Sequence, residues 1–216
     1  MATSGRTPGS TPRSAARGEA REEAILAAAA AILEEDGVAA LTTRRIAERA
    51  RASKETLYAR FGGRRGLLEA LVQRQSGGTN ALLRQALEGP ADAPVRGVLL
   101  AAIAGLLTLL TGPRSLALNR AAIAGVPADT DLAAVLYQRG RATTGPLFEA
   151  VLARATESGE LDCPDPAEAF GVLFGLAVRD AQITALLGAG PAWTGATVED
   201  RAAQAVELFY RLYARR

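Results

Sequence analysis

Histidine is absent from the 216-residue sequence, and cysteine occurs once, as Cys163. Without histidine, the chain has neither a Ser-His-Asp or Cys-His nucleophilic site nor a histidine-based metal site. A Glu-x-x-His pair and a glycine-rich phosphate loop are also missing, which weighs against the alternative of an enzyme with its site inside a helical bundle. We therefore expect no catalytic residues, no bound metal and no cofactor.

The single cysteine excludes an internal disulfide and suits a reducing cytosol, so we expect a cytoplasmic protein. Cys163 lies in the loop sequence LDCPDP, where no basic neighbour would stabilise a thiolate, and we expect an unreactive thiol. The N-terminal segment lacks the apolar core of a signal peptide. The longest uncharged run, residues 97–113, falls short of the roughly 18 to 20 apolar residues that span a bilayer. It is interpreted as a buried helix, and no membrane association is expected.

Aromatic residues make up only 5% of the chain, whereas hydrophobic residues make up 49% and are mostly alanine and leucine. Because β-branched residues form no alternating runs, we expect an all-α fold. Residues 1–18, rich in Ser, Thr, Gly, Pro and Arg, are expected to form a disordered basic tail. Residues 19–75 contain short helical segments and are expected to form a small module. Residues 76–216, with longer and more apolar segments, form a second one.

Capping residues and glycines place the helices. In the first module we expect helices over 19–36, 42–50, 53–61 and 64–75, with Ile25, Ala29, Ile32 and Leu33 on one face of the first. In the second we expect helices over 80–87, 94–110, 114–124, 129–157, 166–187 and 197–214. Gly140 and Pro146 predict a kink in the helix over 129–157.

The basic residues are concentrated in one segment. The net charge is +2, but residues 42–65 contain eight basic residues against Glu48 and Glu55, a local charge of +6. Such a patch is typical of a nucleic-acid surface. Two alternatives remain, a solvated basic hairpin that binds no DNA and a module that binds an acidic protein. The eight are Arg44, Arg45, Arg49, Arg51, Lys54, Arg60, Arg64 and Arg65.

The spacing within residues 42–61 fits a helix-turn-helix. Ile46 and Ala50 lie one turn apart and face inward, Ala47 allows a close helix crossing, and Leu57 anchors the next helix. The exposed first turn of that helix is the part that meets base edges in a major groove. It consists of Ser53, Lys54, Glu55 and Thr56. Hydroxyls and guanidinium groups around it would hold phosphates; these belong to Thr43, Arg44, Tyr58, Arg60 and Arg64.

The sequence LTTRRIAERARASKETLYARF, followed by RRGLL, resembles the DNA-binding domain of TetR/AcrR-family transcriptional regulators. The resemblance implies an all-helical homodimer with an N-terminal helix-turn-helix and a C-terminal ligand-binding and dimerisation domain. The function it implies is a ligand-responsive regulator, usually a repressor that binds a palindromic double-stranded DNA operator and is released by a small-molecule effector. By position, it implies that Thr42 caps the second helix and that Thr43 and Arg44 contact the DNA backbone. Lys54, Glu55 and Thr56 would read bases, Tyr58 would contact phosphate, and Arg64 is the basic residue that opens the fourth helix.

The sequence departs from the family pattern at two turns. Arg51 stands where the family usually has glycine, and a left-handed backbone would cost a non-glycine residue about 1 kcal/mol. Gly62 and Gly63 replace the usual turn and cap residues, so we expect a weakly capped fourth helix.

The C-terminal module is expected to enclose an apolar cavity between its helices. Its candidate lining residues are Leu107, Leu110, Leu118, Ile123, Phe148, Leu152, Phe174 and Val178, with Asn119, Arg120, Arg179, Asp180 and Gln182 as polar candidates. The effector is expected to be apolar or amphipathic.

The helices over 166–187 and 197–214 resemble the pair that forms the family's dimer interface. The apolar face of the last helix carries Val198, Ala202, Ala205, Val206, Phe209 and Tyr213, and small residues on the other helix, Ala169, Gly171 and Gly175, would allow close approach. The alternative is that these residues belong to the core of a single chain.

Overall fold

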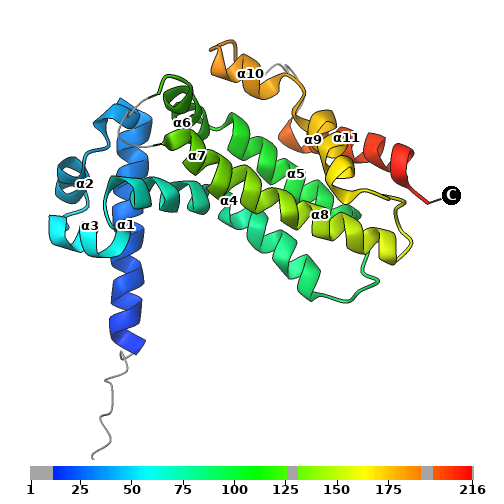
Figure 1. Ribbon diagram of the computed structural model, residues 1–216, viewed down its shortest axis with the longest axis horizontal. Coiled ribbons are helices and arrows are strands. Elements are labelled where there is room, and N and C mark those ends of the chain that lie inside the picture. The colour runs from blue at the N-terminus through cyan, green and yellow to red at the C-terminus, as the bar shows by residue number, and fades with distance from the viewer. Residues whose placement is uncertain (1–11, 126–130, 191–196, 216) are drawn as a thin grey trace, which may run out of the picture.

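The protein is all-α, as expected, in a computed structural model that describes residues 12–125, 131–190 and 197–215. Figure 1 shows α1 at one end of the long axis, with α2 and α3 beside it and α4 running from there into a larger bundle. The helices of the N-terminal half are α1 (Pro12–Asp36), the 3₁₀ turn η1 (Val38–Ala40), α2 (Thr43–Arg49), α3 (Lys54–Phe61), α4 (Arg64–Glu88) and α5 (Arg96–Thr111). They are followed by α6 (Pro113–Ile123), α7 (Leu132–Leu136), the π-helical turn η2 (Tyr137–Arg141), α8 (Ala142–Glu157), α9 (Pro166–Val178), α10 (Ala181–Leu186) and α11 (Val198–Tyr213).

The first helix begins earlier than the sequence predicts. The expectation of a disordered tail over 1–18 is wrong for residues 12–18, which form the first turns of α1, while residues 1–11 lie outside the described residues. Proline is well tolerated at the first position of a helix, and the Ala and Arg residues after Pro12 favour helix. These local preferences outweigh the overall polar composition of the segment.

One hydrophobic core joins α1 to α4. The predicted face of α1 is buried, since Ile25, Ala29, Ile32 and Leu33 are all at most 1% exposed. They pack with residues of α2, α3 and α4, and with Leu118, Leu132 and Val135 from α6 and α7. The N-terminal module therefore shares its core with helices that come later in the chain.

Helix α4 crosses the expected boundary at residue 75 without a break. The prediction of two helices, over 64–75 and 80–87, is wrong, because α4 is continuous through Gly77 and Gly78. Each glycine costs about 1 kcal/mol of helix stability relative to alanine. Tertiary packing offsets this cost, since Asn80 and Leu83, on the next turns, are buried. A single rigid element thus connects the two modules.

A second core fills the bundle of α5, α8, α9 and α11. Phe148 and Phe170 stack in it with ring centroids 4.7 Å apart. The apolar face of α11 packs into this core, with Ala202, Ala205, Val206 and Phe209 at most 1% exposed. Ala169 is buried there as well. For these residues the structure shows intrachain core, the alternative to a dimer contact.

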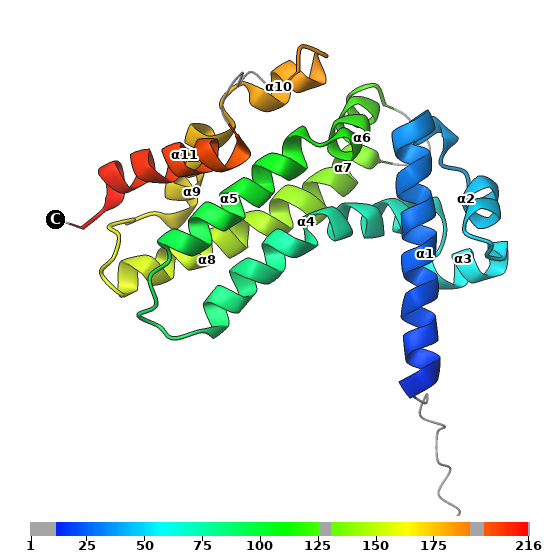
Figure 2. The same ribbon diagram turned by 180° about the vertical axis from the view of Figure 1, so that it is seen from behind.

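Two predicted long helices are interrupted. The segment over 166–187 divides into α9 and α10 at Arg179, whose φ of 45° is left-handed. Within 129–157, the distortion predicted near Gly140 takes the form of the π-turn η2 between α7 and α8. Figure 2 shows α11 and α9 at the end of the molecule opposite to α1.

Candidate DNA-binding surface and effector cavity

Two capped helices form the helix-turn-helix. The Thr42 hydroxyl accepts a hydrogen bond from the Arg45 amide at 3.2 Å, and the Ser53 hydroxyl accepts one from the Thr56 amide at 3.1 Å. These are the caps predicted for α2 and α3. Ile46 and Leu57 are fully buried, as predicted. The inward anchors therefore fix which residues of α2 and α3 face outward.

Both turns that depart from the family pattern contain residues with positive φ, and the turn at Arg51 is not reshaped to avoid the left-handed backbone. Arg51 has a φ of 49°, so the arginine takes the left-handed conformation that is usual for glycine. Gly63 precedes α4 without a side-chain cap, which confirms the expected weak start of that helix. Gly63 has a φ of 127°, and the Tyr58 ring lies close against it.

Lys54, Glu55 and Tyr58 are exposed on α3, and Tyr58 is 54% exposed. Thr56 is half-buried, and its hydroxyl lies 3.0 Å from the Ser53 hydroxyl. A hydrogen bond from its own backbone amide lowers the pKa of Glu55, with a further contribution from Ser53. Ser53, Glu55 and Thr56 thus make contacts at the N-terminus of α3. Lys54 and Tyr58 make no such contact.

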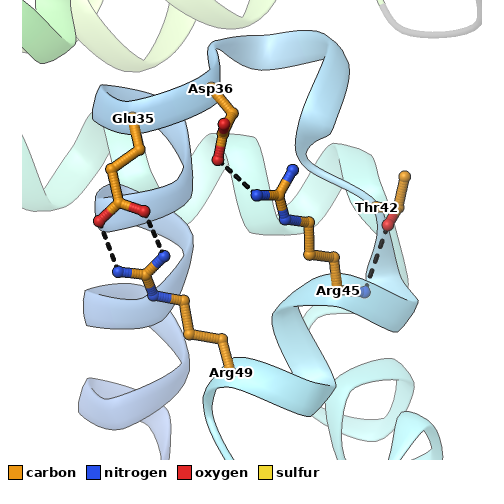
Figure 3. Close-up of polar contacts among 5 residues, drawn as sticks. All are labelled: Glu35, Asp36, Thr42, Arg45 and Arg49. Carbon is orange, nitrogen blue, oxygen red and sulfur yellow. Dashed lines mark hydrogen bonds and ion pairs between the residues drawn. The ribbon is translucent and has the colours of Figure 1, made fainter.

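Three of the eight arginine and lysine side chains bind carboxylates of α1. Arg49 makes a bidentate pair with Glu35, at 2.5 and 2.6 Å, and Arg45 pairs with Asp36, as Figure 3 shows. Arg60, which is predicted to hold phosphate, pairs with Glu22 at 3.3 Å. These pairs hold α2 and α3 against α1, so much of the local charge of +6 serves packing.

Arg64 makes a hydrogen bond within the chain. Its Nη2 donates a hydrogen bond to the Val38 carbonyl at 2.9 Å, and its side chain is half-buried. The guanidinium therefore joins the start of α4 to η1. A contact between Arg64 and a DNA phosphate stays a prediction.

The outer surface of α2 keeps its predicted character. Arg44 has a side chain that is 77% exposed and only a long contact, 3.8 Å, with Glu48. Thr43 is half-buried and Thr42 is exposed beside it. Arg51, which the sequence placed in the basic patch but not among the predicted DNA contacts, adds an exposed basic side chain between α2 and α3. We define Thr42, Thr43, Arg44, Arg51, Lys54 and Tyr58 as the outer surface of the helix-turn-helix.

The Glu35–Arg49 pair predicts an acid-sensitive attachment of α2. The hydrogen bond from Arg49 lowers the pKa of Glu35 below its ordinary value. Because the folded-state pKa is lowered, this carboxylate stabilises the fold above about pH 4, the ordinary glutamate pKa. The contribution disappears as pH falls through the lowered value.

We expect Glu35→Gln to be less stable than the wild type at neutral pH and to lose less stability on acidification. Urea unfolding from about pH 6 to about pH 3 measures this difference. Glu88→Gln, an exposed carboxylate at the end of α4, is the control. Parallel pH profiles for wild type and Glu35→Gln would contradict a stabilising pair.

A partly open cavity of about 460 Å³ lies beside α4 in the bundle, and α5, α6, α8 and α9 also contribute to its wall. Of the eight predicted apolar residues, Leu110, Ile123 and Phe174 line it. The other five are corrected, because they are core residues at most 5% exposed. Leu107, Phe148, Leu152 and Val178 belong to the bundle core, and Leu118 belongs to the core shared with α1.

The polar candidates are divided in the same way. Asn119 and Gln182 line the cavity. Arg120 instead donates to the carbonyls of Ala185 and Leu186, at 2.7 and 2.9 Å, and so holds the end of α10. Arg179 and Asp180 form the exposed break between α9 and α10.

A buried chain of hydrogen bonds connects the cavity wall to α4. The Thr144 hydroxyl of α8 donates to Asn80 Oδ1 at 2.9 Å, and Asn80 Nδ2 donates to the Ser76 hydroxyl at 3.3 Å. All three residues are at most 6% exposed, and Ser76 and Thr144 line the cavity. These hydrogen bonds join the cavity wall on α8 to α4.

Cys163 is buried in the bundle core, and burial raises the pKa of its thiol.

Within the described ranges, no single helix is long and apolar enough to cross a membrane. Helices α5 and α6 taken together are long and apolar enough, but they are bent by 56° relative to each other.

The helix-turn-helix and the cavity bundle define a class of protein, the one-component transcriptional regulators that combine a DNA-binding head with a ligand-binding body. Residues 25–71 match the family model of bacterial regulatory proteins of the tetR family. Residues 97–215 match that of the AefR-like transcriptional repressor C-terminal domain. The chain therefore belongs to the TetR family.

Individual relatives agree with this assignment. A TetR transcriptional regulator from Agrobacterium tumefaciens is 33% identical, with 90% of this chain and 95% of that chain covered and a TM-score of 0.71. SmeT of Stenotrophomonas maltophilia, in a complex with triclosan, is 23% identical and shares the fold, with 91% and 92% covered and a TM-score of 0.69. The uncharacterized HTH-type regulator YvkB of Bacillus subtilis is 39% identical over 61 residues. That match spans 28% of this chain and about a third, 32%, of YvkB.

Proposed function

We propose that this protein is a cytoplasmic repressor that binds a palindromic double-stranded DNA operator as a homodimer and is released by a small apolar or amphipathic effector. The observation that carries the proposal is the single helix α4, which begins beside the helix-turn-helix and forms a wall of the cavity. A ligand in such a place can favour one orientation of the DNA-binding head over another.

The outer surface of the helix-turn-helix supports DNA binding. Lys54 and Tyr58 are exposed on α3, where a recognition helix meets base edges and phosphates, and Arg44 is exposed on α2. A hairpin whose arginines were all paired internally would offer no such groups. Arg44 and Lys54 therefore favour DNA binding over an inert basic hairpin.

The cavity supports a ligand of modest size. Its volume of about 460 Å³ lies within the range of small-molecule sites, roughly 300 to 1,000 Å³. SmeT, which shares this fold, binds triclosan, a small molecule. An effector bound here would contact α4 through Val72, Gln75 or Ser76.

Retardation of a DNA fragment from the protein's own upstream region tests the proposal. We expect binding that weakens steeply with salt, because each phosphate contact releases counterions. A protein-interaction module that binds an acidic partner would leave the fragment unretarded, and this result would reject the proposed function.

Arg44→Ala is expected to weaken binding to all DNA sequences and to flatten the plot of log affinity against log salt by about 0.9, the loss of one phosphate contact. Arg84→Ala is the matched control, because Arg84 is a solvent-exposed residue on the C-terminal half of α4, which belongs to the bundle. It removes the same charge far from the outer surface of the helix-turn-helix.

Lys54→Ala provides a contrast. A lost base contact relaxes the preference at one position of each half-site and costs about 1 to 3 kcal/mol there. If Arg44→Ala and Arg84→Ala have the same slope as the wild type, Arg44 makes no phosphate contact.

A further inference from the structure

The cavity wall is positively charged. Among its described lining residues Arg141 is the single charged one, and no aspartate or glutamate is included. Arg141 is exposed as a whole, so water solvates its charge in the free protein, and an anion in the cavity would add a charge-assisted hydrogen bond that a neutral or cationic effector cannot make.

Aromatic rings hold the Arg141 guanidinium at the cavity wall. Its central carbon lies 4.7 Å from the centroid of the Phe170 ring and 6.0 Å from that of Phe174. Glu149 approaches the same glycine, Gly145, but forms no ion pair with Arg141. Since cation–π contacts occupy only the faces of a guanidinium, its N–H edge still has the capacity to bind a carboxylate or sulfonate.

The backbone places this side chain in the wall through an irregular turn. Arg141 ends the π-turn η2, and Tyr137 and Gly140 of the same turn also line the cavity. A π-turn shifts the register of a helix, so it turns side chains that would otherwise point elsewhere, and such turns are frequent at functional sites.

A second polar group points to the same ligand chemistry. The side-chain nitrogen of Gln75 in α4 is buried and has no hydrogen-bond acceptor. An unpaired buried donor costs about 1 to 3 kcal/mol, and a ligand that supplies an acceptor removes this cost. Gln75 and Arg141 line the same cavity, and both are donors.

The rest of the wall suits an apolar body, with Leu106, Leu110, Phe170 and Phe174 among its residues. We propose that the effector is an apolar organic anion, whose acidic group binds Arg141 and whose acceptor atoms reach Gln75 of α4. The proposal rests on the proposed function, because it specifies the effector of the same cavity. It adds a selectivity for charge that a purely apolar cavity would lack.

Two fluorescent probes test the charge selectivity. Anilinonaphthalene sulfonate carries an anionic group, and N-phenylnaphthylamine is the same aromatic body without it. We expect the wild type to bind the sulfonate at least about tenfold more tightly, the difference of one charge-assisted hydrogen bond. Arg141→Met, which keeps an unbranched apolar side chain beside Phe170, should abolish this preference without changing the affinity for the neutral probe.

Three variants complete the experiment. Arg141→Lys keeps the charge and should retain most of the preference, and Arg84→Met, outside the cavity, should match the wild type. Ala133→Trp places a large side chain at an exposed position of the cavity wall and should weaken the binding of both probes. This result would show that both probes bind in the cavity. Equal binding of the two probes, or an equal loss of both in Arg141→Met, would overturn the charge selectivity and leave the proposed function standing. If Ala133→Trp changes the affinity for neither probe, the assignment of the cavity as the ligand site is overturned. The proposal that an effector binds there and releases DNA is then overturned as well.

Discussion

Gly175→Arg is expected to convert the proposed dimer to a monomer and to lower operator affinity by about a thousandfold or more. Gly175 faces outward from α9, and a side chain added there would meet nothing of its own chain within 4 Å. In a two-fold symmetric interface a contact made by one residue occurs twice, so a long charged side chain at position 175 would be forced into the interface at two places and would keep the helices apart.

The expected size of the effect follows from the two half-sites. One recognition helix reads only a few base pairs, and a dimer places two of them about 34 to 36 Å apart in successive major grooves. Without the partner, binding falls toward the non-specific level, which is typically about 10³ to 10⁷ weaker. Light scattering at micromolar concentration and operator titration measure the two effects.

This substitution separates loss of the dimer from loss of the fold. Replacing a glycine inside a helix by arginine favours the helix by roughly 0.8 kcal/mol, so each chain should keep its helical circular dichroism. Gly78→Arg is the matched control, because Gly78 is also exposed within a helix, α4, and also has open space around it. A Gly175→Arg protein that remains dimeric and binds the operator like Gly78→Arg would place the interface elsewhere.

The helix-turn-helix could be predicted closely from the sequence because its determinants are local. Thr42 and Ser53 each cap a helix through an amide three residues ahead. The inward positions of Ile46 and Leu57 follow from helical periodicity alone. Such features do not depend on the rest of the chain, so a short stretch of sequence contains all that is needed.

The arginine partners could not be predicted in this way. Arg49 pairs with a residue 14 positions away, and Arg60 with one 38 positions away, so both contacts exist only after α1 packs on α2 and α3. A count of charges over residues 42–65 misses these carboxylates because they lie in another helix. The local charge of +6 therefore overstated the number of groups available to DNA.

The lining of the cavity could not be predicted fully from the sequence either. Leu110 and Leu152 look alike in the sequence, but only Leu110 lines the cavity, because the rotation of each helix about its axis decides which face is enclosed. The π-turn η2 adds a shift of register that periodicity does not reveal. Arg141, at the end of that turn, was accordingly absent from the predicted lining.

An effector that releases the operator is expected to bind the free protein about 5- to 150-fold more tightly than the operator-bound protein. By linkage, the factor by which the effector weakens DNA binding equals the factor by which DNA weakens effector binding, and coupling is typically about 1 to 3 kcal/mol. Calorimetric titration of the effector with and without operator measures it. Equal affinities in the two titrations would show that the molecule acts at the DNA surface or indirectly.

The buried chain from Thr144 through Asn80 to Ser76 is expected to carry part of this coupling. Thr144→Val removes the hydroxyl that donates from α8 to Asn80 of α4, so the cavity wall and α4 should respond to each other less. Thr143→Val is the matched control, because that hydroxyl donates to the Gln138 carbonyl on the segment leading into its own helix. We expect the ratio of the two effector affinities to fall toward one in Thr144→Val and to stay at the wild-type value in Thr143→Val. A wild-type ratio in both variants would mean that α4 senses the effector through direct contacts in the cavity, for which Gln75 is the candidate residue.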